Sequence, residues 1–117
     1  MRLKSDFWVQ AYIRQCNDAG HPAVLVRRGQ ADAGAIFIQL LRADGTTTLL
    51  GPAPAGLDAT STDRQFCVRA DGAALDPPEL SARMADELAF DRDLWIIEVE
   101  AREGFPCLDD SLVMPDT

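Results

Sequence analysis

The fold is decided by one run of residues near the C-terminus, Leu94-Trp95-Ile96-Ile97-Glu98-Val99-Glu100. It is rich in aromatic and β-branched residues, which suit the pleated surface of a sheet. Successive side chains of a strand point to opposite faces, so Trp95, Ile97 and Val99 share one fully apolar face. The other face is apolar in its first half and acidic in its second. We therefore expect this strand to anchor the core.

A helix is predicted directly upstream, from the clearest capping signals in the chain. Asp76 is the expected N-cap, Pro77 the first helical residue, and Glu79 completes a capping box three residues after the cap. Apolar residues then recur at helical spacing and form a narrow core-facing stripe: Leu80, Met84 and Leu88.

A second helix is predicted near the N-terminus. Ser5 is the expected N-cap, and Gly20 followed by Pro22 ends the helix. Between these signals, the apolar residues cover one broad arc at about 100° per residue. They are Trp8, Val9, Tyr12, Ile13, Cys16 and Ala19.

Four more strands are predicted, over residues 23–28, 35–42, 46–50 and 65–70. Asp44-Gly45 suits a two-residue hairpin turn, because such turns need positive φ at both central residues. That turn would place Leu40 opposite Leu49, and both faces of the hairpin would then carry apolar groups. One face is expected to take a helix, and the other needs a second cover.

The element order is thus α-β-β-β-β-α-β. Because short turns join successive strands, we expect an α+β fold: a mainly antiparallel sheet of about five strands with two helices packed on one face. We expect residues 1–117 to form a single domain. The Pro- and Gly-rich segment Gly51–Ser61 is expected to be an exposed loop, and residues 101–117 a loosely docked acidic tail.

Composition excludes several classes of protein. Hydrophobic residues make up 47% of the chain and charged residues 26%, as in folded soluble proteins. The formal net charge of −8 would repel a phosphate backbone, so we expect no nucleic-acid partner. No apolar run approaches the ~20 residues that span a membrane, so no membrane partner is expected either. Three widely spaced cysteines do not resemble a disulfide framework, which favours a cytoplasmic location.

No residue pattern indicates catalysis. His21 is the only histidine, and it has no partner residue in the sequence that would make it a general base. Without a second histidine or a C-x-x-C pair, the chain lacks a typical zinc set. Cys16 and Cys67 fit core positions, whereas Cys107 is the more exposed thiol. We expect no metal ion, no cofactor and no enzymatic activity.

Two charged segments are candidate binding residues. Arg27 and Arg28 end a predicted strand, and Asp91 and Asp93 form the turn before the anchor strand. An anion or a small molecule bound between these two ends, in a binding protein or an enzyme, is one hypothesis for the function. A solvated strand end that pairs with the excess acid of the chain is the alternative.

Two blocks of sequence carry a resemblance. The first is Arg2-Leu3-Lys4-Ser5-Asp6-Phe7-Trp8-Val9, followed by Arg27-Arg28-Gly29 and Ala33-Gly34-Ala35-Ile36-Phe37; the second is Phe90–Glu100. Together they resemble the bacterial family known as domain of unknown function 1491. The resemblance implies a stand-alone cytosolic bacterial protein, and it implies no activity, cofactor or catalytic residue.

The leading hypothesis is a small non-enzymatic protein that binds a protein partner or forms a homodimer. It depends on the two-sided apolar hairpin, whose expected interface residues are Phe37, Leu41 and Leu50. A dimer that covers this face would suit a chain of this size.

Overall fold

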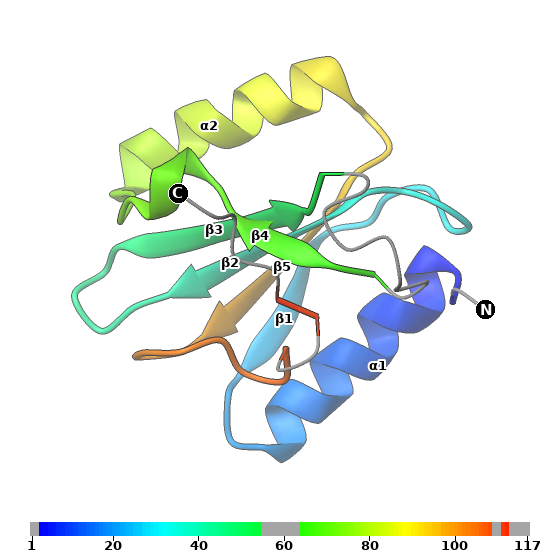
Figure 1. The fold of residues 1–117 in the computed structure, drawn as a ribbon, viewed down its shortest axis with the longest axis horizontal. Helices are drawn as coiled ribbons and strands as arrows, with labels where there is room; N and C mark the ends of the chain where they lie inside the picture. Colours follow the sequence, from blue (N-terminus) through cyan, green and yellow to red (C-terminus); the bar gives the residue numbers. More distant parts are fainter. Residues whose placement is uncertain (1–2, 55–63, 109–110, 113–117) are drawn as a thin grey trace.

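The computed structural model describes residues 3–54, 64–108 and 111–112, and its elements follow the predicted order (Figure 1). A short 3₁₀ turn, η1, is added before the second helix. The elements are α1 (Ser5–Asp18), β1 (Ala23–Arg27), β2 (Ile36–Leu41), β3 (Thr47–Pro52), β4 (Phe66–Val68), η1 (Ala70–Gly72), α2 (Pro77–Phe90) and β5 (Trp95–Glu100).

The five strands form one mixed sheet in the order β1-β5-β2-β3-β4. The last strand of the chain lies between the first two, where it runs parallel to β2 and antiparallel to β1. The remaining pairs are antiparallel, so the sheet is mainly antiparallel as expected. The insertion of β5 leaves β1 at one edge of the sheet and β4 at the other.

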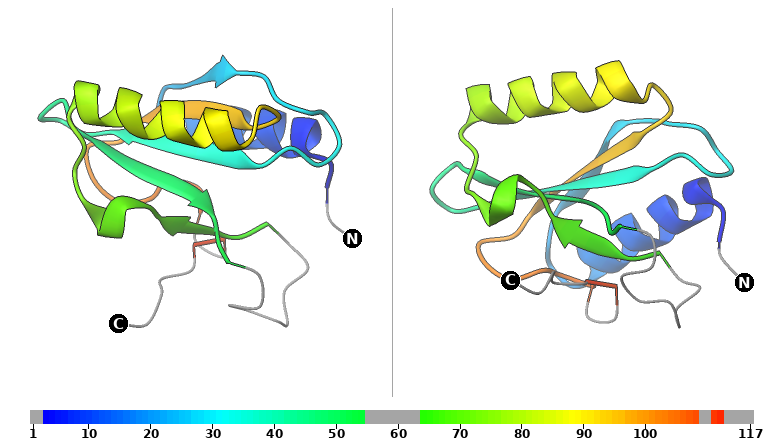
Figure 2. Two further views of the ribbon diagram at one scale, coloured as in Figure 1. Left: turned by 90° about the horizontal axis from the view of Figure 1, so that it is seen from above. Right: turned by 45° about the horizontal axis from the view of Figure 1, so that its top comes forward.

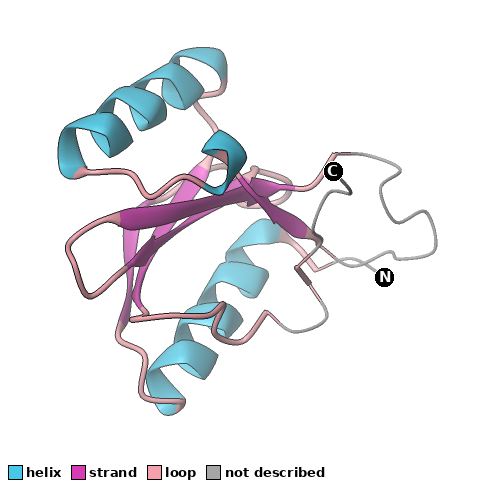
Figure 3. Ribbon diagram, turned by 60° about the vertical axis from the view of Figure 1, so that its left-hand side comes forward, coloured by secondary structure: helices cyan, strands magenta, loops and turns pink. Residues whose placement is uncertain are grey.

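The two helices lie on opposite faces of this sheet (Figures 2 and 3). The prediction that both pack on one face was therefore wrong. Its error lies in the central strands β2 and β5, which are apolar on both sides and need cover on both, as strands buried on two faces do. The second cover that the hairpin needs is α2.

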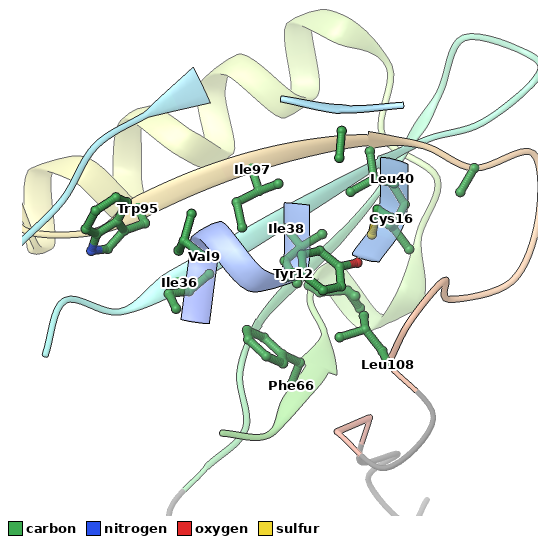
Figure 4. Close-up of a cluster of buried hydrophobic side chains, with 14 residues drawn as sticks. Val9, Tyr12, Cys16, Ile36, Ile38, Leu40, Phe66, Trp95, Ile97 and Leu108 are labelled. Atoms are coloured by element: carbon green, nitrogen blue, oxygen red, sulfur yellow. The ribbon is translucent and has the colours of Figure 1, made fainter. Parts of the chain in front are cut away.

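One core lies between α1 and the sheet. Trp95, Ile97 and Val99 point into it, as predicted from their alternation, and all three are buried. Figure 4 shows Tyr12 of α1 and Leu108 of the C-terminal segment gathered around the same cluster. The second core lies under α2 and contains the other face of the anchor strand; its buried members are Phe37, Leu49, Leu75, Met84, Leu94 and Ile96.

The predicted N-cap was right for α2 and wrong for α1, whose end before a left-handed Gly20 was predicted correctly. Asp76 accepts a hydrogen bond from the backbone N–H of Glu79, and the Glu79 side chain accepts one from the N–H of Asp76. In α1, by contrast, Lys4 is the N-cap and Ser5 is the first helical residue. The Ser5 hydroxyl is buried, donates to the Gly34 carbonyl at 2.7 Å and is therefore occupied by a tertiary contact.

The hairpin between β2 and β3 is shifted by one residue from the expected register. Leu40 lies opposite Thr48, and Leu49 lies opposite Gln39. The reason is a three-residue connection, in which the N–H of Arg42 bonds the carbonyl of Thr46 and only Gly45 has positive φ. A shift of one residue moves a side chain to the other face, so Leu49 joins the α2 core.

Two segments were expected to be irregular, residues 51–61 and 101–117. Their described parts are more closely packed than predicted. Gly51 and Pro52 belong to β3, while residues 55–61 of the expected loop lie outside the described part of the chain. Leu108 is 1% exposed, and Tyr12 donates a hydrogen bond to the carbonyl of Pro106. Ala101 and Leu108 therefore belong to the α1 core, and they hold the described part of this segment against the domain.

Candidate functional site

The structure brings together the two charged segments named as a candidate binding site. Nη2 of Arg27 donates to the backbone carbonyl of Arg92 at 2.8 Å, so the end of β1 contacts the turn before β5. The guanidinium of Arg28 lies over the Trp95 ring, 5.4 Å from its centroid. Asp91 caps its own turn by accepting a hydrogen bond from the N–H of Asp93. The two arginines are therefore engaged in joining two segments of the chain, whereas Asp91 stabilises its own turn.

This joint is tight, and its tightness explains two glycines. The N–H of Gln30 donates to the carbonyl of Asp93, and the indole N–H of Trp95 donates to the carbonyl of Gln30. A Cβ at Gly29 or at Gly34 would collide with the same Asp93 carbonyl. Among the described residues, no ion pair links Arg27 or Arg28 to an aspartate of the turn. The geometry therefore gives these residues a structural role, and ligand binding by them stays a prediction.

The apolar face expected to form an interface is covered within the single chain. Phe37 is 4% exposed and Leu50 is fully buried, while Leu41 is half-buried. The α2 core covers Phe37 on one side, and the guanidinium of Arg69 lies 5.6 Å from its ring centroid. Phe37 belongs to the α2 core and Leu50 to the α1 core, so the two do not share a face of the sheet, and neither needs a second copy of the chain to cover it.

A run of consecutive exposed apolar side chains lies instead on β1. Val24 is 55% exposed, Leu25 41% and Val26 54%, although all three belong to β1, whose register with β5 shifts between Leu25 and Arg27. Val24 lies opposite Glu98 of β5, and Leu25 lies opposite Ile97. Three consecutive residues therefore present apolar side chains on both faces of an edge strand, with no charged residue before Arg27.

The backbone of β1 is partly protected on its outer side. The side-chain amide of Asn17 exchanges two hydrogen bonds with the N–H and carbonyl of Ala23. In an antiparallel pair of strands, the backbone groups of every second residue bond the same neighbouring strand. The carbonyl of Pro22 accepts a hydrogen bond from the N–H of Glu100, so the groups of Pro22 are directed towards β5. The backbone groups of Leu25, like those of Ala23, are therefore directed away from β5. We call the outer side of residues 23–27, with the side chains of Val24, Leu25 and Val26, the open edge.

The sequence contained one signal for this surface. Residues 24–26 are apolar without alternation, which is typical of a strand that is buried on both faces. The sheet order places that strand at an edge, and an edge position converts a buried-type sequence into exposed surface. Neighbour relations of this kind cannot be inferred from the strand itself.

The buried thiol does not form a nucleophilic site. Burial raises the pKa of Cys16 to about 11, so this thiol is uncharged at neutral pH. Burial likewise raises the pKa of Tyr12, whose hydroxyl is hydrogen-bonded to Pro106. Cys107 is exposed, and no disulfide joins the three cysteines.

Two further observations concern the part of the chain that the structure describes. Within it, no group of three or more His, Cys, Asp or Glu side chains is arranged to hold a metal ion. No helix in the same residues is long and apolar enough to cross a membrane.

Together, these features define a small α+β domain in which a mixed five-stranded sheet lies between two helices. The chain belongs to the family described as protein of unknown function DUF1491, whose sequence model matches residues 3–109. Curated proteins gave no match.

Solved structures support the same assignment. The solution structure of protein Atu0922 from A. tumefaciens is 38% identical, with a TM-score of 0.76 over 89% of this chain and 90% of that one. A DUF1491 family protein from Caulobacter crescentus is 29% identical in its crystal structure, with a TM-score of 0.75 over 97% of this chain and 99% of that one. An NMR structure of a DUF1491 family protein from the same organism gives a TM-score of 0.77 at 29% identity, over 97% of this chain and 98% of that one.

Proposed function

We propose that the protein is a non-enzymatic interaction protein that forms a homodimer through the open edge. The observation that carries the proposal is the exposure of Val24, Leu25 and Val26 on an edge strand. Exposed apolar edges of this kind are avoided in monomeric proteins because they pair with other chains. The proposal keeps the class of function that the sequence indicated and moves its surface from the hairpin to β1.

A second copy of the chain fits this edge better than a chain of unrelated sequence, because the edge is complementary to itself. If two β1 strands pair antiparallel about Leu25, the backbone groups of the two Leu25 residues face each other across the two-fold axis. The same axis brings Arg28 of one copy beside Pro22 of the other. Pro22 is bonded to Glu100, which is exposed, so the basic end of one strand meets an acidic end of its partner.

The expected dimer is weak. Covering six half-exposed aliphatic side chains contributes on the order of 1 kcal/mol each. This gain barely exceeds the cost of association, which is at least about 4 kcal/mol. The surplus of about 2 kcal/mol, with about 1 kcal/mol from each of the two backbone hydrogen bonds that a pair of Leu25 residues would form, corresponds to a Kd on the order of 1 mM. The apparent mass should therefore rise with protein concentration.

The test is the effect of Leu25→Lys on the solution mass, measured by sedimentation equilibrium over a series of concentrations. Leu25 is exposed in the single chain, so a lysine there leaves the core intact and charges the open edge. We expect the wild-type chain to dimerise and the variant to stay monomeric. Phe90→Lys is the matched control, because Phe90 is 92% exposed on α2 and should not affect the dimer. A wild-type chain that is monomeric at millimolar concentration would refute the proposal.

We also propose a cytoplasmic location. Three free thiols, two of them buried, support a reducing compartment, where disulfides are rare. Fractionation of bacterial cells that produce the chain at natural levels should recover it with cytoplasmic markers. Recovery with the periplasmic or membrane fraction would contradict this location.

A further inference from the structure

A hollow of about 510 Å³ lies at one end of the sheet, beside the segment that leads into β1. The parallel strands β2 and β5 both end there, since Leu41 lies opposite Glu100 in their register. The segment before β1 reaches the same place, because Glu100 donates its N–H to the carbonyl of Pro22. Three connections therefore meet at the carboxyl ends of two parallel strands, the location where sheets that contain parallel strands commonly bind ligands. The charged or titratable side chains in its wall are His21, Arg42, Glu100, Arg102 and Glu103.

Arg42 is held rigidly in this wall. Its Nε donates to Thr48 Oγ1 at 3.0 Å, and Nη1 donates to the carbonyls of Ala101 and Gly104 at 3.1 and 2.8 Å. Its guanidinium also lies over the Phe105 ring, 5.6 Å from the centroid. These contacts use three of the five N–H groups of the guanidinium and fix its plane.

The remaining nitrogen of the guanidinium, Nη2, is unoccupied. Within the described residues, nothing accepts a hydrogen bond from the two N–H groups of Nη2, and this nitrogen is accessible to solvent. No carboxylate forms an ion pair with Arg42 in the same part of the chain, although acidic residues outnumber basic ones by 19 to 11. Partial burial lowers the pKa of Arg42 from its usual value, because desolvation disfavours the charge. An anion at Nη2 would relieve that cost.

From this geometry we propose that the hollow binds a small ligand through a carboxylate group, with Arg42 as its principal donor. The contacts of Nε and Nη1 fix the direction of the two free N–H groups of Nη2, and each of these can donate a charge-assisted hydrogen bond to a carboxylate oxygen. Arg102 and His21 stand in the same wall and supply further positive charge or hydrogen-bond donors, while Pro22 and Leu41 provide apolar surface for the body of the ligand.

The wall itself argues for a carboxylate rather than a phosphate. Glu100 and Glu103 also line the hollow, so an incoming anion meets negative charge as well as positive. A phosphate monoester carries about −1.5 to −2 charges at neutral pH, whereas a carboxylate carries one. The repulsion from two glutamates therefore disfavours the phosphate more strongly. A ligand that also carries an ammonium group would turn these glutamates into favourable contacts.

The probe experiment is a titration of the ¹⁵N-labelled full chain with sodium acetate, glycine and inorganic phosphate, followed by NMR at constant ionic strength with sodium chloride as the reference. We expect saturable shifts of the Arg42 Nε–H and of the amides of Ala43 and Arg102, with a Kd on the order of millimolar for so small a ligand. Glycine should bind at least as well as acetate, and phosphate more weakly. Shifts no larger than those with chloride, or tighter binding of phosphate than of acetate, would overturn the proposal.

Two variants that each replace an alanine by glutamate locate the site and leave Arg42 unchanged. Ala43 is exposed and lines the hollow, so Ala43→Glu adds a negative charge beside the bound carboxylate. We expect acetate to bind about fivefold more weakly, the usual scale of one partly solvated charge interaction. Ala85→Glu adds the same charge on the exposed surface of α2, outside the wall of the hollow, and should leave binding unchanged. Equal effects of the two variants would show that only net charge matters, and the assigned site would be wrong.

Discussion

The two edges of the sheet are treated in opposite ways. At the β4 edge, Phe66 is 1% exposed, and its N–H donates to the carbonyl of Ser111 at 2.7 Å. Leu112 forms a parallel bridge with the same residue, so the C-terminal segment closes this edge. At the β1 edge, Asn17 covers only Ala23, and the three residues that follow remain exposed.

The comparison shows where the chain provides its own cover and where it does not. Both edge strands are short and apolar, and both present backbone groups that need partners. The C-terminal segment can reach only one of them, because Tyr12 and the α1 core hold it on the β4 side. An edge strand that is apolar and exposed in the single chain is a candidate for pairing with a second chain.

The largest expected effect comes from truncating the closed edge. Phe66 packs with its ring centroid 5.0 Å from that of Trp8, so Phe66→Ala removes a buried aromatic side chain and leaves a cavity. We expect it to lower the free energy of unfolding by about 3–5 kcal/mol, measured by urea denaturation. Leu25→Ala at the open edge should cost less than about 1 kcal/mol at concentrations where the chain is monomeric.

Similar losses at the two edges would break the comparison. A large loss from Leu25→Ala would mean that β1 is integral to the fold of the single chain. In that case its exposure would not make it available to a partner.

An intermediate effect is expected from alkaline pH, which acts where the C-terminal segment meets α1. Burial raises the pKa of Cys16 from 9.0 to about 11. Between these values the thiol is ionised in the unfolded chain and protonated in the folded one, so folding takes up a proton. The contribution is therefore fully present below pH 9.0 and is lost as the pH rises to about 11. The loss amounts to roughly 2 kcal/mol in the free energy of unfolding.

The control for this prediction is Cys16→Ala. The variant starts from a lower stability because it shortens a buried side chain, but it lacks the ionisable thiol. Urea denaturation at several pH values should therefore show a shallower alkaline decline than in the wild-type chain. Equal slopes would assign the decline to other groups.

The parts of the fold that depend on local sequence could be predicted. The capping box at Asp76 and the alternation through Trp95 and Ile97 are encoded by residues only a few positions apart. The side of the sheet that each helix covers is not local information. The side that each helix covers follows from the insertion of β5 between β1 and β2. This insertion also creates a parallel pair, which no turn residue in the sequence indicates.

The candidate sites show the same limit. From the sequence, Arg27 and Asp93 were predicted to belong to one binding site, and the structure places their segments in contact. It could not indicate that backbone carbonyls would occupy the arginine, or that Phe37 would already be covered by α2. Arg42 gave no signal as an isolated charge after a strand, since its significance arises from Thr48, Ala101 and Gly104, which the fold brings to it.

The smallest expected effect tests the orientation of the proposed dimer. Pairing about Leu25 brings Arg28 of one copy near Glu100 of the other, and both residues are exposed in the single chain. Arg28→Glu or Glu100→Arg alone should weaken the dimer by about 0.5–1 kcal/mol, and the double variant should recover most of the loss. Sedimentation equilibrium of the wild-type chain and the three variants measures this coupling. A parallel arrangement would place the two arginines together instead, so Glu100→Arg would not rescue Arg28→Glu. Additive losses in the double variant would therefore reject the antiparallel pairing. The open edge would remain the contact surface.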